Sequence, residues 1–475
     1  METATQTLHR LTSYQPGRPW DVPVADPRVL PDLVTNDLDR LPWFVKRYPK
    51  PLPRVPLPRD LPPTTGPALA VLAGLAGVPA RELDLAQLSR LLYLSAGVVR
   101  TMARPFGTWL FRAAGSAGGR FPLELYVAVP EGRPLPAGVH WYDPLGHALV
   151  QVGPPPRGDA PAVAVTGVPW RTGWRYRERG YRHMYWDAGT MLAQLLAVAG
   201  SAGLPAALYT RFPDAAVAAL TGADQVHEVP VAVVSLGAGA PAVDPGGPAA
   251  TGLVDRAPVE FPLVTAAQRA GAASQFGPPL GQGAPVQVPV PAPAPVEAVI
   301  LARGSARRMD AQRGLPVGVL HTAMSVALRG VGLPHRVVVH DVAGLDPGVY
   351  RWPDLSAPAR PGALRAELHR VCLNQALARD AAFVVVAAAT VSGLDDRQYR
   401  EAQLTAGLAE GRLHLAAYAL GACASGMTFL DSEVPALLGE PLDGLLFTCV
   451  GQPAYRSAPG GPPGTPTPIR QVRSS

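Results

Sequence analysis

The chain repeats one pattern of residues at a fixed distance. Three groups recur 218 residues later with no gaps between them: Tyr181-Arg182, Ala188-Gly189 and Gly203 return as Tyr399-Arg400, Ala406-Gly407 and Gly421. Longer stretches correspond too, since LPAGVHWYDP in the first half matches LDPGVYRWPD in the second, and AVAVTG matches FVVVAAA. A repeat of this length contains a whole domain. The pattern therefore predicts a duplicated domain whose two copies pair as a pseudo-dimer, not a solenoid.

The first copy mixes helix and strand patterns. Apolar residues at helical spacing, with Asp84 available as a cap, predict a helix from Leu85 to Leu94. The segment FPLELYVAV predicts a strand, GVHWYDP a turn, HALVQV a short strand and PAVAVTGV a further buried strand. The apolar run YWDAGTMLAQLLAVAGSAGLPAAL predicts a long helix that ends between Gly200 and Pro205. The order of helix, strands and long helix in each copy indicates the α+β class.

Glycine and proline divide the chain into segments. There are 49 Gly and 55 Pro, concentrated outside the two copies, and a Pro-rich N-terminal stretch ends in KRYPKPLPRVPLPRDLPP. Such stretches are typical of polyproline arms and linkers. We expect five segments: an extended arm over 1–63, the first copy over 64–236, a Gly/Pro/Ala-rich linker over 237–295, the second copy over 296–456 and a tail over 457–475.

Composition excludes several classes of protein. Because 48% of the residues are apolar and only 16% are charged, the chain is not a disordered polyampholyte. The net charge of +6 is spread along the chain without an arginine-rich run or a zinc spacing, so neither nucleic acid nor a metal is expected to bind. The N-terminus lacks an apolar signal core, and no apolar run is long enough to span a bilayer. Cys372, Cys423 and Cys449 form no pairing pattern, which predicts a reducing, cytoplasmic location away from membranes.

Several long motifs resemble one known family. The runs PWRTGWRYRERGYRHMYWDAG, FRAAGSAGGRFPLELYVAV and PAGVHWYDPLGHAL resemble the SagB-type dehydrogenases of the nitroreductase superfamily. In the second copy, ELHRVCLNQALARDAAFVVVAAA and GACASGMTFLDSEVPALLGEP resemble the same family. The resemblance covers most of residues 9–220 and 296–456. It implies two tandem nitroreductase-like domains that form an intramolecular pseudo-dimer, and an FMN cofactor held where the two copies meet.

The resemblance assigns the phosphate clamp for FMN to the second copy only. The family holds the phosphate with an Arg-x-Ser-x-Arg segment, because guanidinium groups bind phosphate bidentately. Here ILARGSARRMD supplies that segment through Arg303, Ser305, Arg307 and Arg308. The equivalent stretch of the first copy, TTGPALAVLAGLAGV, has no arginine. By the same resemblance, Arg456 is a basic C-terminal residue that can add a phosphate contact.

The complementary flavin-binding pieces are divided between the copies. A Pro-Ser-x-Gly-like loop appears only in the first copy, with Gly115 in place of the proline and then Ser116, Ala117 and Gly118. A glycine segment that lets backbone approach the flavin ring appears only in the second copy, and it contains Gly421, Ser425, Gly426 and Met427. The first copy reads SAGLPAALYT there, where a proline removes one N–H. The resemblance therefore implies a single composite flavin site, and the mirror-related site is expected to be inactive.

Catalysis is expected at Tyr176, with Arg175 beside it. Family members carry Lys-Tyr within a Trp-Lys-Tyr-x-x-Arg motif, and this chain has arginine in the lysine position. Arginine cannot accept a proton near neutral pH. Tyr176 could serve as the base if Arg175 lowers its pKa. Alternatively, Arg175 positions the peptide while Tyr181, His183 or Glu178 is the base, or the protein is a scaffold without catalysis. The only two lysines, Lys46 and Lys50, lie in the arm.

The resemblance implies an FMN-dependent dehydrogenase that oxidises thiazoline or oxazoline rings to azoles in a ribosomally synthesised peptide, of the thiopeptide or a related kind. Its expected partners are the precursor peptide, a cyclodehydratase and a leader-recognition protein. Other flavin chemistry on a peptide or small molecule, or a flavin-free scaffold subunit, are the alternatives. No GxGxxG follows a strand, so nothing indicates a nicotinamide donor, and oxygen is the expected electron acceptor.

Overall fold

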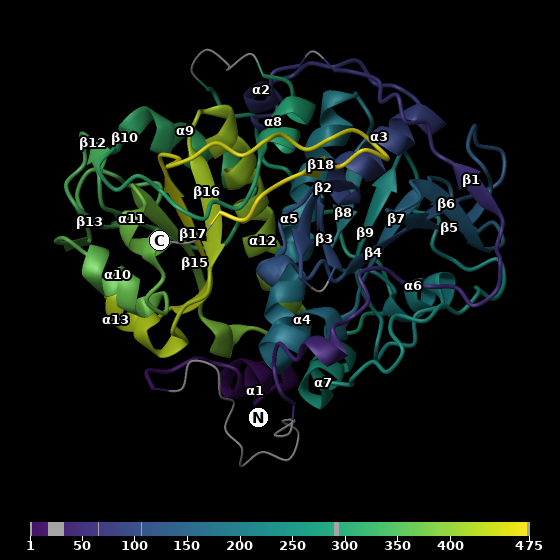
Figure 1. The fold of residues 1–475 in the computed structure, drawn as a ribbon, viewed down its shortest axis with the longest axis horizontal. Coiled ribbons are helices and arrows are strands. Elements are labelled where there is room, and N and C mark those ends of the chain that lie inside the picture. The colour runs from purple at the N-terminus through teal and green to yellow at the C-terminus, as the bar shows by residue number, and fades with distance from the viewer. Residues whose placement is uncertain (1, 18–32, 65, 106, 289–293, 473–475) are drawn as a thin grey trace.

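Two α+β halves lie side by side, the first in blue to teal and the second in green to yellow (Figure 1). The computed structural model describes residues 2–17, 33–64, 66–105, 107–288 and 294–472. Parts of the expected arm, linker and tail, at 18–32, 289–293 and 473–475, therefore lie outside the described residues.

A seven-stranded sheet with the order β1-β6-β5-β4-β7-β9-β8 organises the first half, and β1 (Arg54–Pro56) is one of its edge strands. Every residue of the central strand β7 is buried, and both faces of this sheet pack against apolar side chains. The elements of this half are α2 (Ala68–Leu72), α3 (Leu85–Ala96), β2 (Val98–Arg104), β3 (Gly107–Arg112), β4 (Leu123–Val129), β5 (Gly138–Asp143), β6 (Ala148–Gly153), β7 (Ala162–Gly167), α4 (Pro169–Tyr176), α5 (Gly180–Ser201), β8 (Ala206–Tyr209), α6 (Asp214–Thr221) and β9 (Val229–Leu236).

A six-stranded sheet with the order β14-β13-β11-β15-β17-β16 organises the second half. Its core order β13-β11-β15-β17-β16 matches β5-β4-β7-β9-β8 strand for strand, so the repeat does encode two tandem α+β domains. The elements are α8 (Val296–Ala302), β10 (Leu315–Pro316), α9 (Val317–Ala327), β11 (His335–Val339), β12 (Val342–Ala343), β13 (Gly348–Arg351), β14 (Arg360–Pro361), α10 (Arg365–Val371), α11 (Ala376–Asp380), β15 (Phe383–Ala389), α12 (Asp396–Ala419), β16 (Cys423–Met427), α13 (Val434–Leu438) and β17 (Asp443–Gly451).

The turn expected at GVHWYDP is wrong. Gly138–Asp143 forms strand β5, whose six residues are all buried between β4 and β6. The chain reverses just after this strand, over residues 144–147. The segment expected as a turn is therefore a strand that separates its two neighbours, because burial on both faces overrides the turn character of the sequence.

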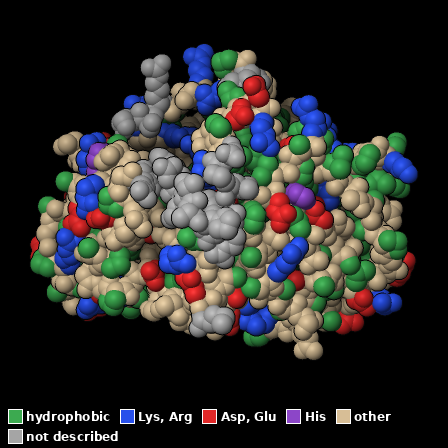
Figure 2. Space-filling model, turned by 90° about the horizontal axis from the view of Figure 1, so that it is seen from below, with side chains coloured by type: hydrophobic (Ala, Val, Ile, Leu, Met, Phe, Trp, Pro, Cys, Tyr) green, Lys and Arg blue, Asp and Glu red, His purple; other side chains and the backbone are tan. Residues whose placement is uncertain are grey.

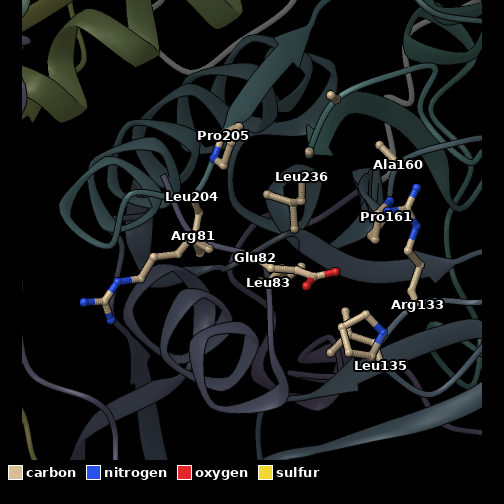
Figure 3. A pocket seen from close by; sticks show the side chains of 13 residues that line it. Arg81, Glu82, Leu83, Arg133, Leu135, Ala160, Pro161, Leu204, Pro205 and Leu236 are labelled. Atoms are coloured by element: carbon tan, nitrogen blue, oxygen red, sulfur yellow. The ribbon is translucent and has the colours of Figure 1, made fainter. Parts of the chain in front are cut away.

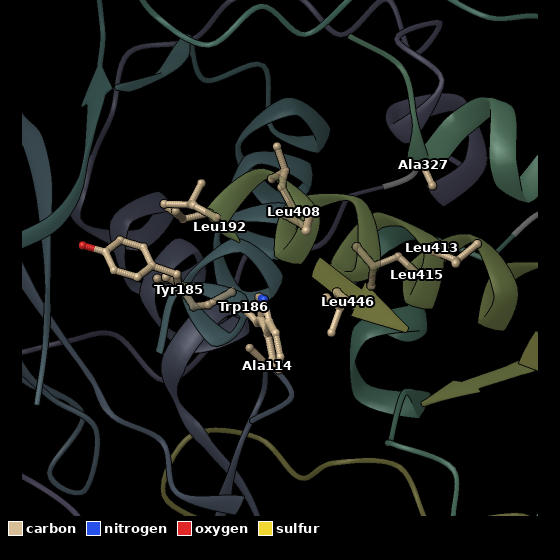
Figure 4. Packing of buried hydrophobic residues seen from close by; sticks show 14 of the residues in the cluster. Ala114, Tyr185, Trp186, Leu192, Ala327, Leu408, Leu413, Leu415 and Leu446 are labelled. Atoms are coloured by element: carbon tan, nitrogen blue, oxygen red, sulfur yellow. The ribbon is translucent and has the colours of Figure 1, made fainter. Parts of the chain in front are cut away.

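The repeated Ala-Gly pairs lie where the two long helices cross. A Cβ atom added to Gly189 of α5 would collide with backbone atoms of Leu404 and Leu408, and one added to Gly407 of α12 would collide with the backbone of Trp186. Buried side chains that include Trp186, Leu192 and Leu408 surround this crossing (Figure 4). The small residues therefore let α5 and α12 approach closely, as a pseudo-dimer interface requires.

Replacing Gly407 with leucine is expected to separate these helices. The atoms that the new side chain meets are backbone, which cannot rotate away, so the cost should reach or exceed the roughly 1–3 kcal/mol typical of overpacking. Thermal unfolding of Gly407→Leu measures the loss. Gly393→Leu is the matched control, because Gly393 is exposed and nothing lies within 4 Å of an added Cβ there. Equal melting temperatures for the two variants would contradict the role of Gly407.

Two mirror-related ion clusters join the copies. Arg179 and Arg182 of the first copy both bond Asp431 of the second, at 2.6 Å each. Arg397 and Arg400, 218 residues after this pair of arginines, bond Asp214 of the first copy at 2.7 and 2.8 Å. All six side chains are almost fully buried. The repeated Tyr-Arg motif thus marks the interface between the copies.

The N-terminal arm contains ordered elements and does not consist only of extended chain. Helix α1 (Ala4–Leu11) packs against the second copy, where the backbone N–H of Thr5 donates to Asp396 at 2.7 Å. Strand β1 (Arg54–Pro56) adds to the edge of the first sheet beside β6. In the linker region, α7 (Pro262–Ala270) forms a further helix near α1 (Figure 1). The arm therefore contacts both copies.

The C-terminal segment crosses from the second copy to the first. Strand β18 (Thr467–Pro468) pairs in parallel with β2, and this pairing completes a three-stranded sheet with β3. The yellow trace in Figure 1 follows this crossing. The backbone N–H groups of Gly460 and Gly461 donate to Leu301 of the second copy and Val99 of the first, respectively. The segment expected as a tail therefore ties the two halves together.

The surface carries both signs of charge. Basic and acidic side chains are interspersed over the face seen from below (Figure 2). Within the described ranges no helix is long and apolar enough to cross a membrane, and no group of three or more His, Cys, Asp or Glu side chains could hold a metal ion.

Candidate functional site

The loop of Gly115 to Gly118, from the first copy, contacts the second copy at its first residue. A Cβ atom added to Gly115 would lie 3.4 Å from Nη1 of Arg303 and 3.7 Å from Oγ of Ser305. Two of the residues expected to hold flavin phosphate therefore face this loop. The loop and the clamp come from opposite copies, as the composite arrangement requires.

The last residue of this loop contacts the expected catalytic pair. Gly118 has a φ of +60°, and an added Cβ would lie 2.5 Å from Cδ of Arg175 and 2.9 Å from the hydroxyl of Tyr176. The loop needs glycine here because of both the left-handed backbone and the close approach. One loop thus separates the clamp residues from Arg175 and Tyr176.

Asp187 of α5 fixes the middle of the loop. The hydroxyl of Ser116 and the backbone N–H of Ala117 donate to its two carboxylate oxygens, at 2.5 and 2.8 Å. Ser116 Oγ also accepts the backbone N–H of Phe121 at 2.7 Å, so its hydroxyl is already engaged within the protein. Burial raises the pKa of Asp187 to about 8, although the bonds from Ser116 and Ala117 lower it. The sequence did not indicate Asp187 as a site residue, since nothing in the chain links it to residues some 70 positions earlier.

Arg303 is the buried member of the clamp. It follows helix α8 directly, is 3% exposed and donates from Nη2 to the carbonyl of Ala113 at 2.6 Å. Its Nε and Nη1 are buried without a hydrogen-bond partner. Burial lowers the pKa of Arg303 to about 10. A buried cation with unused donors beside a glycine loop suits an anionic group such as phosphate.

The other clamp arginines lie at the surface around Tyr455. Arg307 donates its backbone N–H to the Tyr455 hydroxyl at 3.0 Å, and the guanidinium of Arg308 lies 6.0 Å from the centre of that ring. Arg456 is adjacent in sequence and exposed. All three arginines are exposed, unlike the buried Arg303.

The glycine segment runs beside the clamp. Ser305 pairs with Ala424 of β16, the strand that contains Ser425, Gly426 and Met427. A Cβ added to Gly426 would collide with the carboxylate of Glu410 on α12. Thr190 of α5 reaches the same carboxylate at 3.4 Å. Glu410 is a further acidic neighbour that the sequence did not indicate.

Gly421 lies just after the end of helix α12. It has a φ of +78°, and nothing lies within 4 Å of an added Cβ. Gly203 has a φ of +70° at the corresponding end of α5. Both glycines therefore end the long helices, which is a sufficient reason for the repeat to contain them.

Tyr176 keeps its proton more tightly than expected. Burial raises the pKa of Tyr176 above its usual value near 10, and the charge of Arg175 only partly offsets this effect. Arg175 therefore lowers the pKa of Tyr176 as expected, but burial outweighs this effect. Arg175 is itself exposed and donates to the side chain of Asn36 in the arm at 3.1 Å.

The alternative bases are packed away or coupled to Tyr176. Tyr181 lies among the aromatic rings of the copy interface, 6.4 Å from the Tyr399 ring. His183 stacks on Tyr176 with centroids 4.0 Å apart, and burial holds its pKa well below the usual value. Glu178 is fully buried. Lys46, the buried lysine, bonds Glu228 at 2.6 Å inside the first domain.

The mirror-related position is filled by protein. Arg329 follows α9 and donates to the carbonyls of Leu72 and Gly283, both at 3.1 Å. The linker residue Val286 donates its N–H to the carbonyl of Ala73. Gly283 and Gly330 touch so closely that neither could carry a Cβ. Arg329 and the linker residues Gly283 and Val286 therefore occupy the region that corresponds, by the pseudo-symmetry, to the phosphate clamp and the Gly115–Gly118 loop.

A separate cavity of about 100 Å³ opens in the first domain (Figure 3). Arg81, Glu82, Arg133, Leu135 and Leu236 are among its lining residues. None of the expected flavin or catalytic residues line it. It is therefore distinct from the composite site.

Comparison with known proteins places the fold. No protein-family model matches the chain. A curated "putative nitroreductase" from Methanocaldococcus jannaschii is 25% identical over 170 residues, which span 33% of this chain and 81% of that protein. The crystal structure of a "putative nitroreductase" from Anabaena variabilis has a TM-score of 0.72 and 23% identity, and the match covers 95% of this chain and 100% of that one. The chain thus has a nitroreductase-like fold in two tandem copies that form an intramolecular pseudo-dimer.

One further match involves peptide modification. The E. coli microcin synthetase complex McbBCD, with a truncated precursor bound, matches 38% of this chain at 20% identity. The match covers 70% of that chain, with a TM-score of 0.28.

Proposed function

We propose that the chain is an FMN-dependent oxidoreductase with a single composite site. The observation that carries the proposal is the position of the Gly115–Gly118 loop. This loop of one copy contacts Arg303 of the other copy at one end and Arg175 and Tyr176 at the other. FMN needs a basic group for its phosphate and a different group beside its reacting ring. The two ends of this loop would supply them.

Arg303 and Ser305 would hold the phosphate of FMN, and the exposed arginines at 307, 308 and 456 would add to the positive field. The unused donors of Arg303 support this assignment, because a buried guanidinium is costly without an anion. The backbone of the Gly115–Gly118 loop and of Ser425, Gly426 and Met427 would flank the ring. FMN, when bound, supplies a two-electron acceptor.

We further propose that the substrate is an azoline ring in a ribosomally synthesised peptide of the thiopeptide or a related kind, which the protein oxidises to an azole. The resemblance of the Trp174–Arg179 motif to SagB-type dehydrogenases supports this choice. The reaction removes two hydrogens per ring, as a hydride equivalent to the flavin and a proton to a base, and oxygen would reoxidise the flavin. A cyclodehydratase must make the azoline first, and a leader-recognition protein would deliver the precursor. The three buried, unpaired cysteines are compatible with a reducing cytoplasm.

Purification and mass spectrometry test the proposal. The protein should be yellow, and an azoline peptide should lose the mass of two hydrogens per ring in air. A yellow protein that leaves azolines unchanged would favour other flavin chemistry on a peptide or small molecule. A colourless protein that does not take up added FMN would favour a scaffold subunit.

The pH dependence of the rate tests Tyr176 as the base. Its pKa lies above 10, so only a small fraction is phenolate at pH 7, and that fraction grows about tenfold per pH unit below the pKa. The rate should therefore keep rising from pH 7 to pH 9, and Tyr176→Phe should abolish the rise. A rate that levels off near pH 8 in both proteins would point to Asp187 instead, whose pKa is about 8.

A further inference from the structure

A sandwiched arginine lies next to the composite site. The guanidinium of Arg120 lies 4.5 Å from the ring centre of Trp109 and 4.7 Å from that of Trp174. The side chain is 9% exposed, and its Nε is buried without a partner. Two indole faces on one guanidinium fix its position at little entropic cost. The guanidinium of Arg120 is thus held in place, and its Nε is unused within the part of the chain that the structure describes.

A second cation lies close to this one. The charge of Arg175 adds to burial in lowering the pKa of Arg120 to about 10. Neither arginine forms an ion pair with a carboxylate anywhere in the part of the chain that the structure describes. Two neighbouring cations without a counter-ion repel each other, so the arrangement is stabilised only when an anion joins them.

The position of this pair points to the substrate side of the site. Arg120 follows Gly118 and Gly119 directly in the chain, and Arg175 contacts Gly118. Arg303, with its own unused donors, lies at the opposite end of the same loop. One of the two indoles, Trp109, comes from β3 in the β2–β3 hairpin, which has no counterpart between α9 and β11 of the second copy. The sandwich therefore exists at only one of the two pseudo-symmetric positions.

We propose that Arg120, together with Arg175, binds a carboxylate of the peptide substrate, so that the protein prefers peptides with an acidic residue close to the reacting ring. The proposal rests on the proposed function in treating a peptide as the substrate. The carboxylate accepts hydrogen bonds from both guanidinium groups, and the indoles of Trp109 and Trp174 shield the Arg120 guanidinium from water.

Calorimetry on the full chain tests this proposal without turnover. The probes are an acetylated, amidated Gly-Glu-Glu-Gly peptide and its Gly-Gln-Gln-Gly counterpart. The unmodified protein should bind the Glu peptide at least about tenfold more tightly, and the preference should shrink in high salt. Arg120→Gln should remove the preference and retain flavin, whereas Arg313→Gln, an exposed arginine elsewhere, should retain both.

Three results would overturn the proposal. They are equal binding of the two peptides by the unmodified protein, an unchanged preference in Arg120→Gln, and loss of flavin from Arg120→Gln, which would assign the cation to the cofactor phosphate. The comparison of the two peptides on the unmodified protein remains valid even if Arg120→Gln fails to fold.

With azoline versions of the two peptides, the difference should appear in KM and not in kcat. If azolines are not oxidised at all, the preference for the Glu peptide can still be measured. Failure of the proposed function is therefore distinguishable from failure of the carboxylate-binding proposal.

Discussion

The Arg303→Ala variant is expected to purify with less than about a tenth of the flavin of the unmodified protein. Arg303 is the buried cation at the junction of the two copies, and its Nε and Nη1 have no protein partner. Charge-assisted bonds from such a group to phosphate are worth about 1.5–3 kcal/mol each, so losing two of them would lower affinity by orders of magnitude. Absorbance of released flavin against protein concentration measures the effect.

Arg329→Ala is the matched control for this experiment. Arg329 lies at the mirror-related position, where its donors are taken by the carbonyls of Leu72 and Gly283. Its removal should leave the flavin content unchanged, even where it lowers stability. Full flavin content in Arg303→Ala, or equal losses in the two variants, would contradict the composite site.

The Asp431→Ala variant is expected to lose about 3–5 kcal/mol of stability. The substitution leaves Arg179 and Arg182 buried without their carboxylate partner, and it also removes the acceptor for the backbone N–H of Tyr14. Asp244→Ala is the control, because its pair with Arg157 is exposed, and exposed pairs contribute little to stability. Urea unfolding of both variants provides the comparison. A similar small loss in the two would show that the buried cluster does not hold the copies together.

Low pH should cause part of the loss of stability that Asp431→Ala causes. Burial alone would raise the pKa of Asp431, but the charges of Arg179 and Arg182 outweigh it and lower the pKa from 3.8 to about 2. A carboxyl with a lowered pKa stabilises the folded state fully above its unfolded-state value, and it loses this contribution as pH falls towards 2. The stability difference between the unmodified protein and Asp431→Ala should therefore narrow below about pH 4. A difference that stays constant down to pH 2 would contradict this assignment.

Most of the fold could be predicted from the sequence repeat. Because Ala188-Gly189 and Tyr181-Arg182 recur at one offset, the sequence predicted two related domains, and the matching strand orders confirm them. The sequence did not reveal that the Ala-Gly pairs lie at the helix crossing or that the Tyr-Arg motifs lie in the ion clusters. Both features depend on which surfaces of the two domains meet. The strand at 138–143 was missed because its burial comes from β4 and β6 and not from its own pattern.

Sequence reasoning reached only part of the candidate site. Motif resemblance selected Arg303, Gly118 and Tyr176, and the fold brings these residues to one loop. The resemblance gave no indication of Asp187 or Arg120, because each acts through neighbours far away in the sequence, Ser116 for the first and Trp174 for the second. The sequence also did not indicate that burial raises the pKa of Tyr176. Proximity to Arg175 can be read from the chain, whereas burial depends on the packed structure.

The ratio of FMN to protein tests the central claim most directly. Two pseudo-symmetric positions exist, but the clamp, the loop and the glycine segment meet at one of them, while Arg329 and the linker fill the other. After saturation with FMN and removal of the excess, we expect one flavin per 475-residue chain. Two flavins per chain, or none, would contradict a single composite site.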